Sequence, residues 1–259
     1  MKNKWFLLLW CIWLCNALQA QTSKPREYYQ ITVYHFKDTL EENLIDDYLQ
    51  HALLPALHGM NVQHIGVFKA LSNDTVADKK MYVLMPVKSL NDIADINKKL
   101  VANTSYLNAG KRYLNAPYDT APYTRMENIL LQAFPLAPQM QLPHLNGARS
   151  ERVYELRSYE SATEKLYASK VKMFNTGDEI GIFKKLDFNA VFYAEVLAGS
   201  RMPNLMYMTT FENMQERETH WKAFGESPEF KALLAMPEYQ HNVSKADIIF
   251  LRPTDYSDL

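Results

Sequence analysis

A seven-residue stretch occurs in two closely similar copies in this chain of 259 residues. Ile65–Leu71 reads Ile-Gly-Val-Phe-Lys-Ala-Leu, and Ile180–Leu186 reads Ile-Gly-Ile-Phe-Lys-Lys-Leu. The surroundings repeat as well, because a tyrosine-rich alternating segment precedes each copy, at Tyr29–Tyr34 and at Tyr154–Tyr159. A period of roughly 120 residues is the size of a whole domain and indicates a duplicated module rather than a solenoid. We therefore expect two related units.

The first 20 residues have the pattern of a secretory signal peptide. Lys2 and Lys4 give a positive start, the apolar run Trp5–Leu14 follows, and Ala20 offers a small residue for cleavage before Gln21. Such a run is too short for a stable membrane span. We therefore expect an exported protein, periplasmic or secreted.

Both cysteines, Cys11 and Cys15, lie inside this leader. A lipoprotein signal that uses Cys15 is the alternative, although Trp13 and Leu14 are bulky where small residues are expected. Without the leader, the chain has no disulfide, no thiolate nucleophile and no cysteine-ligated metal. Its formal charge of −1 conceals no basic patch of the kind that grips nucleic acid.

The spacing of apolar residues predicts the same order of elements in both copies. In the first copy, strands are expected at 27–36, 62–70, 79–87 and 126–134, with helices at 40–57 and 89–101. In the second, strands are expected at 152–159, 180–186, 190–197, 205–211 and 246–251, with helices at 161–177, 214–224 and 228–234. A proline-bearing linker, 135–151, separates a first repeat at 27–134 from a second at 152–259.

The order in the first copy is β-α-β-β-α-β, the ferredoxin-like motif, and we expect the second copy to follow it. Each such unit covers one sheet face with helices and leaves the other face bare. The predicted fold class is therefore α+β: two tandem ferredoxin-like repeats pair their bare faces into a dimeric α+β barrel within one chain, which removes most exposed strand edges. The alternative is two units joined loosely by the linker.

The second copy resembles the NIPSNAP family. The resemblance is carried by Phe188–Phe211, His220–Phe224 and Tyr239–Ser244, with Tyr154–Tyr159 as the opening strand. It covers residues 152–259 and is much weaker over 27–134. It implies the tandem fold but little chemistry, because the family lacks a well-defined reaction. The broader barrel superfamily includes cofactor-free monooxygenases, haem-degrading enzymes and dye-decolourising peroxidases, an analogy of fold alone.

A polar set is expected to face the barrel lumen, since side chains alternate along strands. On the opposite face, Phe192, Ala194 and Val196 suit packing against helices. The first copy has Gln30 and Thr32 where the second has acid and arginine, so a site would exist in one half only. An arginine beside two carboxylates would keep them ionised and could bind a carboxylate ligand; the alternative is a buried structural network. The set comprises Glu155, Arg157, Tyr193, Glu195 and Tyr207.

Arg201 and Asn204 lie in the long hairpin connection of the second copy, where they could bind an anionic group at the barrel mouth. The alternative is that these residues only shape the turn.

None of the seven histidines has metal-ligand spacing, and we predict neither a metal site nor a cofactor. His220, beside Trp221, is a conceivable haem ligand; the alternative is a helix that packs onto a sheet.

Three functions follow from these features. The first is binding of a small molecule or a protein partner at the barrel, with no assigned reaction; a homo-oligomer is also open. The second is a cofactor-free oxygenase or isomerase with Glu155 or Glu195 as base and Arg157 as anchor. The third is haem binding. An enclosed lumen of about 300 Å³ or more lined by the acid–arginine set would favour catalysis, and a lumen filled by tyrosine and methionine would remove it.

Overall fold

The computed structural model describes residues 24–259, so the leader predicted for residues 1–20 lies outside the described part of the chain. The first half follows the ferredoxin-like order and adds two short helices, α4 and α5, that the sequence pattern does not predict. Its elements are β1 (Tyr28–Phe36), α1 (Thr39–Tyr48), the π-helical η1 (Leu49–Leu53), α2 (Leu54–Gly59), β2 (Gly66–Ala70), the 3-10 turn η2 (Leu71–Asp74), β3 (Lys79–Val87), α3 (Leu90–Ala102), α4 (Thr104–Ala109), α5 (Lys111–Leu114) and β4 (Arg125–Ala133).

The second half repeats the strand order with a different set of helices. Its elements are β5 (Val153–Glu160), α6 (Glu164–Phe174), α7 (Glu179–Lys185), β6 (Phe192–Ala198), β7 (Asn204–Phe211), α8 (Met214–Glu226), α9 (Pro228–Ala235), the 3-10 turn η3 (Pro237–Tyr239) and β8 (Lys245–Pro253). None of the helices within residues 24–259 combines the length and the apolar character that crossing a bilayer requires. The borders of the two repeats and of the linker stay predictions.

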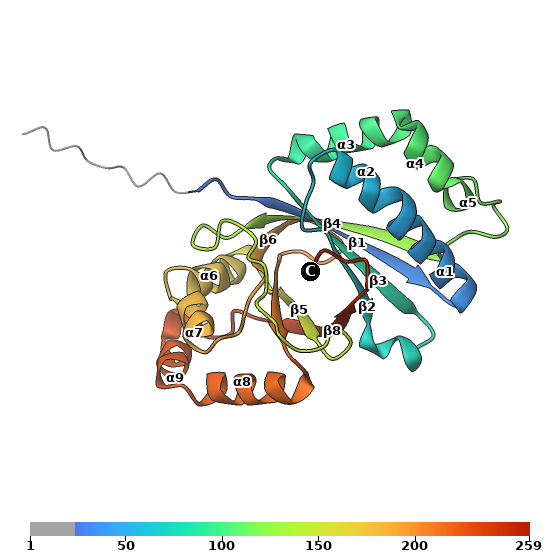
Figure 1. The fold of residues 1–259 in the computed structure, drawn as a ribbon. Helices are drawn as coiled ribbons and strands as arrows, with labels where there is room; N and C mark the ends of the chain where they lie inside the picture. The colour runs from blue at the N-terminus through green and yellow to red at the C-terminus, as the bar shows by residue number, and fades with distance from the viewer. Residues whose placement is uncertain (1–23) are drawn as a thin grey trace, which may run out of the picture.

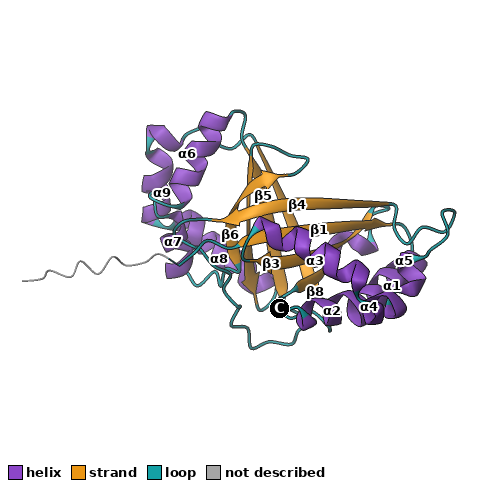
Figure 2. Ribbon diagram, turned by 90° about the horizontal axis from the view of Figure 1, so that it is seen from above, coloured by secondary structure: helices purple, strands orange, loops and turns teal. Residues whose placement is uncertain are grey.

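The eight strands close into one antiparallel barrel in the order β1-β3-β2-β8-β5-β7-β6-β4. Each half contributes four neighbouring strands in the ferredoxin-like order, which confirms the predicted fold class. The halves meet at two seams, where β2 pairs with β8 and β4 pairs with β6. The helices of the two halves lie on opposite sides of the strands (Figures 1 and 2).

Alternation along the strands produces three separate apolar cores. One lies between the first half's strands and its helices, and a second lies in the same place in the second half. The third is the barrel lumen, to which both halves contribute. One end of the lumen is filled by large side chains, namely Tyr29, Phe68, Tyr154, Phe192 and Leu259.

Side-chain caps define where several helices begin. Asp38 accepts a hydrogen bond from the Glu41 backbone N–H at the start of α1, and Ser89 forms a capping box with Asp92 at the start of α3. Thr163 and Asn213 cap α6 and α8 in the same way. Each cap satisfies a backbone donor that the first helical turn leaves unpaired. The cap at Asn213 matters most below, because α8 carries side chains that reach the second sheet.

The two copies of the seven-residue stretch fold differently. Ile65–Leu71 contains strand β2, as predicted, whereas Ile180–Leu186 lies mostly in helix α7, so the strand predicted at 180–186 is wrong. The structural counterpart of β2 is β6. Short apolar runs suit either period, and the flanks favour a helix here. Glu179 stands at the positive end of the helix dipole, and Lys184 and Lys185 stand at its negative end.

Glu212 holds the segment between β4 and β5. Its carboxylate accepts hydrogen bonds from the backbone N–H groups of Asn146, at 2.8 Å, and Gly147, at 2.6 Å. These two bonds lower the pKa of Glu212 below its ordinary value. Because the folded-state pKa is lowered, the stabilising contribution is complete above the ordinary carboxyl range and is lost as the pH falls through the lowered pKa.

We therefore expect the amide proton shifts of Asn146 and Gly147 in NMR spectra to titrate with a midpoint below that of a free glutamate. Glu212→Gln should abolish this titration. A midpoint at or above the ordinary glutamate value would contradict the contact.

Candidate functional site

Glu155 lies at the centre of a buried charged cluster, the Glu155 network. Its side chain has no exposed surface and accepts four hydrogen bonds. Arg157 Nε donates at 2.6 Å, Arg217 donates through Nε at 2.8 Å and Nη2 at 3.0 Å, and Trp221 Nε1 donates at 2.8 Å. The guanidinium of Arg157 also lies 3.5 Å from the centre of the Trp221 ring. The carboxylate is thus fully satisfied by strand β5 and helix α8.

Two tyrosines extend this network. Arg157 Nη1 donates to the Tyr159 hydroxyl at 2.8 Å, and that hydroxyl is 2.8 Å from the hydroxyl of Tyr207. Burial alone would lower the pKa of Arg157, but Tyr207, Tyr159 and Glu155 raise it above the ordinary value. Burial raises the pKa of Tyr207. The arginine is therefore a permanent cation and Tyr207 a neutral phenol.

The prediction that this set faces the lumen is wrong. The Glu155 network lies on the outer, helix-covered face of the second sheet, together with Tyr193. The lumen face carries the other alternating set, including Phe192, Ala194 and Val196, which were expected to pack against helices. Both faces of this sheet are buried, so alternation identifies the members of each face without showing which face is inside. Helix α8 supplies the hydrogen-bond donors that stabilise the buried carboxylate of Glu155 on the outer face.

Arg217 and Trp221 are members of the network that sequence reasoning missed. They lie four residues apart on α8, so they share one helix face. This four-residue spacing is the sequence signal that places both side chains on one helix face, provided that Asn213 is taken as the start of the helix. The first half has no counterpart of this charge: Gln30 and Thr32 on β1 instead hydrogen-bond Asn128 at 2.9 and 2.7 Å.

The remaining predicted residues of the second sheet and α8 lie apart from Glu155. Tyr193 stacks on Tyr207 with ring centres 5.7 Å apart. Glu195 pairs with Arg26 Nη2 at 2.7 Å and accepts from the Tyr167 hydroxyl at 3.2 Å. His220 Nδ1 lies 2.7 Å from the Leu186 carbonyl oxygen, and its Nε2 lies 3.8 Å from Glu216. The structure therefore joins Glu155, Arg157 and Tyr207, but not Glu195 or His220.

The open end of the lumen forms a cavity of about 560 Å³, the mouth cavity, to which all eight strands contribute. Its inner wall is apolar, and its rim carries most of the polar side chains. Arg201 and Asn204, predicted for the barrel mouth, do line it. The apolar wall includes Val33, Ile129, Val196, Met206 and Ile249, and the polar side chains include His35, Asp78, Lys80, Tyr82, Glu127, Ser158, Arg201, Asn204 and Asp247.

Ion pairs within the rim balance its charges. On the first half's side, His35 lies between Asp78, 2.8 Å from Nδ1, and Glu127, 3.6 Å from Nε2. On the second half's side, Arg201 pairs with Asp247. Burial would raise the pKa of Asp78, but the hydrogen bond with His35 and the charges of His35 and Lys80 lower it. Each of these rim side chains therefore has an ion-pair or hydrogen-bond partner within the rim.

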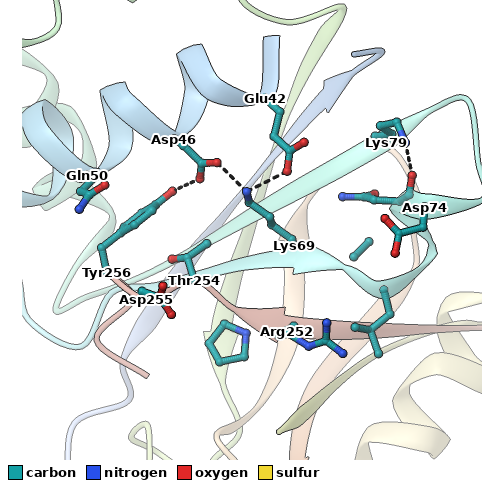
Figure 3. A pocket seen from close by; sticks show the side chains of 14 residues that line it. Glu42, Asp46, Gln50, Lys69, Asp74, Lys79, Arg252, Thr254, Asp255 and Tyr256 are labelled. Atoms are coloured by element: carbon teal, nitrogen blue, oxygen red, sulfur yellow. Dashed lines mark hydrogen bonds and ion pairs between the residues drawn. The ribbon is translucent and has the colours of Figure 1, made fainter. Parts of the chain in front are cut away.

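A second cavity, a polar groove of about 670 Å³, lies on the outside where α1 meets the β2–β8 seam (Figure 3). Lys69 bridges Glu42, at 2.8 Å, and Asp46, at 2.6 Å, and Tyr256 donates to Asp46. Charged and polar side chains make up most of its lining, and it lacks the apolar wall of the mouth cavity.

Within residues 24–259 no group of three or more His, Cys, Asp or Glu residues is placed to hold a metal ion.

Residues 154–258 match the model of the NIPSNAP family. The second half is a NIPSNAP domain. The match begins at the second residue of β5 and ends beyond β8, so the domain includes the whole Glu155 network and half of the barrel. No functionally curated protein matches the chain.

Solved structures share the architecture over nearly the whole chain. A proposed monooxygenase from Lactobacillus acidophilus NCFM has a TM-score of 0.56 at 9% identity, covering 88% of this chain and 94% of that one. A second, from Fusobacterium nucleatum, has a TM-score of 0.55 at 9% identity, covering 89% and 93%. An anthrone oxidase-like protein has a TM-score of 0.50 at 8% identity, covering 90% and 93%. These likenesses show that the NIPSNAP domain and the first half together form a dimeric α+β barrel.

Proposed function

We propose that this protein binds a small, largely apolar molecule in the mouth cavity. The observation that supports this proposal is the cavity itself. Its volume of about 560 Å³ lies in the range of small-molecule sites, and such sites combine apolar walls with a few polar groups. The Glu155 network offers no comparable space, because its carboxylate is fully buried and all its hydrogen bonds are internal.

In the oxygenase alternative, the two glutamates predicted as general bases do not face the lumen. A general base must reach its substrate, and Glu155 and Glu195 both lie on the outer face of the second sheet. The proposed monooxygenases with this fold support a chamber for small molecules at the lumen, at the level of architecture alone. The binding proposal therefore includes no reaction step. With the leader-like residues 1–20, we propose that binding takes place after export.

A pair of substitutions on β6 tests this proposal. Val196 is 4% exposed and lines the mouth cavity, whereas its neighbour Leu197 is 42% exposed on the outside of the same strand. Val196→Phe places a phenyl ring in the cavity and should weaken binding of 2-ethylnaphthalene, measured by fluorescence titration, at least about tenfold. Leu197→Phe adds the same ring outside and should leave the affinity unchanged.

Circular dichroism of both variants checks that the barrel is intact. Equal affinities for wild type and a folded Val196→Phe variant, or an absence of binding by the wild type, would contradict a ligand site in the mouth cavity.

A further inference from the structure

We propose that the mouth cavity selects an uncharged ligand that carries a carbonyl oxygen, and that the Tyr82 hydroxyl donates the hydrogen bond that recognises it. This inference rests on the proposed function and specifies the chemical class of its ligand. Three observations carry it: the Tyr82 hydroxyl without a protein partner, the internal pairing of the charged groups named on the rim, and the apolar wall.

Tyr82 presents an unused donor to the cavity. It extends from β3, its side chain is packed in the lumen core, and only 6% of the residue is exposed. It lines the mouth cavity. Its hydroxyl makes no hydrogen bond to another side chain or to the backbone within residues 24–259, while the hydroxyls of Tyr159 and Tyr207 on the outer face are paired. Because Tyr82 lines the cavity and its hydroxyl has no protein partner, a ligand atom that accepts a hydrogen bond can pair with it.

Tyr82 is a donor throughout the physiological pH range. Burial raises its pKa; Arg201 lowers it somewhat, and Asp78 and Glu127 raise it further. All three of these groups line the mouth cavity together with Tyr82. A protonated phenol donates one hydrogen bond, and a carbonyl oxygen is an acceptor that needs no donor in return.

The rim disfavours a charged ligand. His35, Lys80 and Arg201 each have a carboxylate partner within the rim, so an anionic ligand would compete with Asp78 or Asp247 and be repelled by their charge. A cationic ligand would likewise compete with His35, Lys80 or Arg201 for the same carboxylates. The apolar wall would in addition remove the charge from water without replacing its hydration.

The rim also disfavours a ligand that must donate. Asp78, Glu127 and Asp247 are the carboxylate acceptors that line the cavity, and each is paired with a basic side chain, Lys80, Arg125 and Arg201 respectively. Ser158 and Asn204 hydrogen-bond to each other at 2.8 Å. A ligand hydroxyl would have to share an acceptor that a rim partner already uses, whereas a ketone needs no acceptor.

Matched naphthalene probes test the inference on the intact protein by isothermal titration calorimetry. 2-Acetylnaphthalene, 2-ethylnaphthalene and 2-naphthoate share one ring system and differ in carrying a ketone, a hydrocarbon group and a carboxylate. We expect the ketone to bind about fivefold more tightly than the hydrocarbon, the gain of one neutral hydrogen bond. The carboxylate should bind more weakly than either.

Tyr82→Phe removes the donor and keeps the ring. It should reduce the affinity for 2-acetylnaphthalene about fivefold, to that of 2-ethylnaphthalene, and leave 2-ethylnaphthalene unchanged. Tyr154→Phe is the matched control, because Tyr154 lies in the filled end of the lumen and does not line the mouth cavity. It should change neither affinity.

The outcomes separate the inference from the proposed function. If 2-ethylnaphthalene binds and Val196→Phe abolishes its binding, while the ketone has no advantage or keeps it in Tyr82→Phe, the ligand class is wrong and the site stands. Tightest binding of 2-naphthoate would also overturn the inference. If none of the three probes binds the wild type, the proposed function and the inference built on it both fail.

Discussion

Replacing Glu155 by Gln is expected to lower the free energy of unfolding by about 3–5 kcal/mol, the cost of leaving buried charges without their partner. Arg157 and Arg217 both direct their guanidinium groups at this carboxylate, and only 10% and 11% of their side chains are exposed. The glutamine amide keeps the shape of the side chain but removes the charge and turns an N–H group toward cationic donors. Urea unfolding followed by circular dichroism measures the loss.

Glu195→Gln is the matched control for this substitution. Glu195 lies on the same outer face of the second sheet, but it is partly exposed and has a single cationic partner, Arg26. An ion pair of that exposure contributes at most about 1 kcal/mol. Similar losses for Glu155→Gln and Glu195→Gln would show that the Glu155 network is not the electrostatic attachment of α8 to the sheet.

Replacing Phe183 by Ala is expected to cost about 3–5 kcal/mol of the free energy of unfolding, as for other large buried aromatic residues. Phe183 is 1% exposed, and its ring lies between those of Phe174 and Phe224, with ring centres 6.2 and 4.5 Å away. Its neighbour Ile182 is also buried, and Ile182→Ala should cost about 2–4 kcal/mol.

Large losses at these two consecutive positions test the packing of α7 in the apolar core on the outer face of the second sheet. Lys184→Ala, at an exposed position of α7, should change the free energy of unfolding by less than about 0.5 kcal/mol. A small loss for either Ile182→Ala or Phe183→Ala would contradict the docking of α7 seen here.

The architecture could be predicted from the sequence because strand periodicity and the order of elements are local signals. Strand β3 has the predicted bounds, and the other observed strands end within a few residues of theirs. The seven-residue copies pointed to the correct duplication through segments that are not equivalent. The two similar segments fold as β2 in one half and as α7 in the other, because their flanking charges and packing partners differ.

The site was harder to predict than the fold, since it depends on contacts between distant elements. Alternation correctly grouped Glu155 with Arg157, but nothing local showed that α8 would cover them. Tyr82 carries no sequence signal at all: one tyrosine among 16 becomes distinctive only because the fold places its unpaired hydroxyl in the lining of the mouth cavity. Arg201 and Asn204 were placed at the mouth because the long hairpin between two strands must end at a barrel rim.

The lumen core belongs to neither half alone. Tyr29 and Ile31 from one half meet Tyr154, Leu156 and Phe192 from the other across the barrel axis. Either half in isolation would expose this concave apolar face to water and would need another surface in place of the other half. A substitution that changes side-chain volume on one wall must consequently be accommodated by side chains of the other half, so the two halves cannot be redesigned independently on their inner faces.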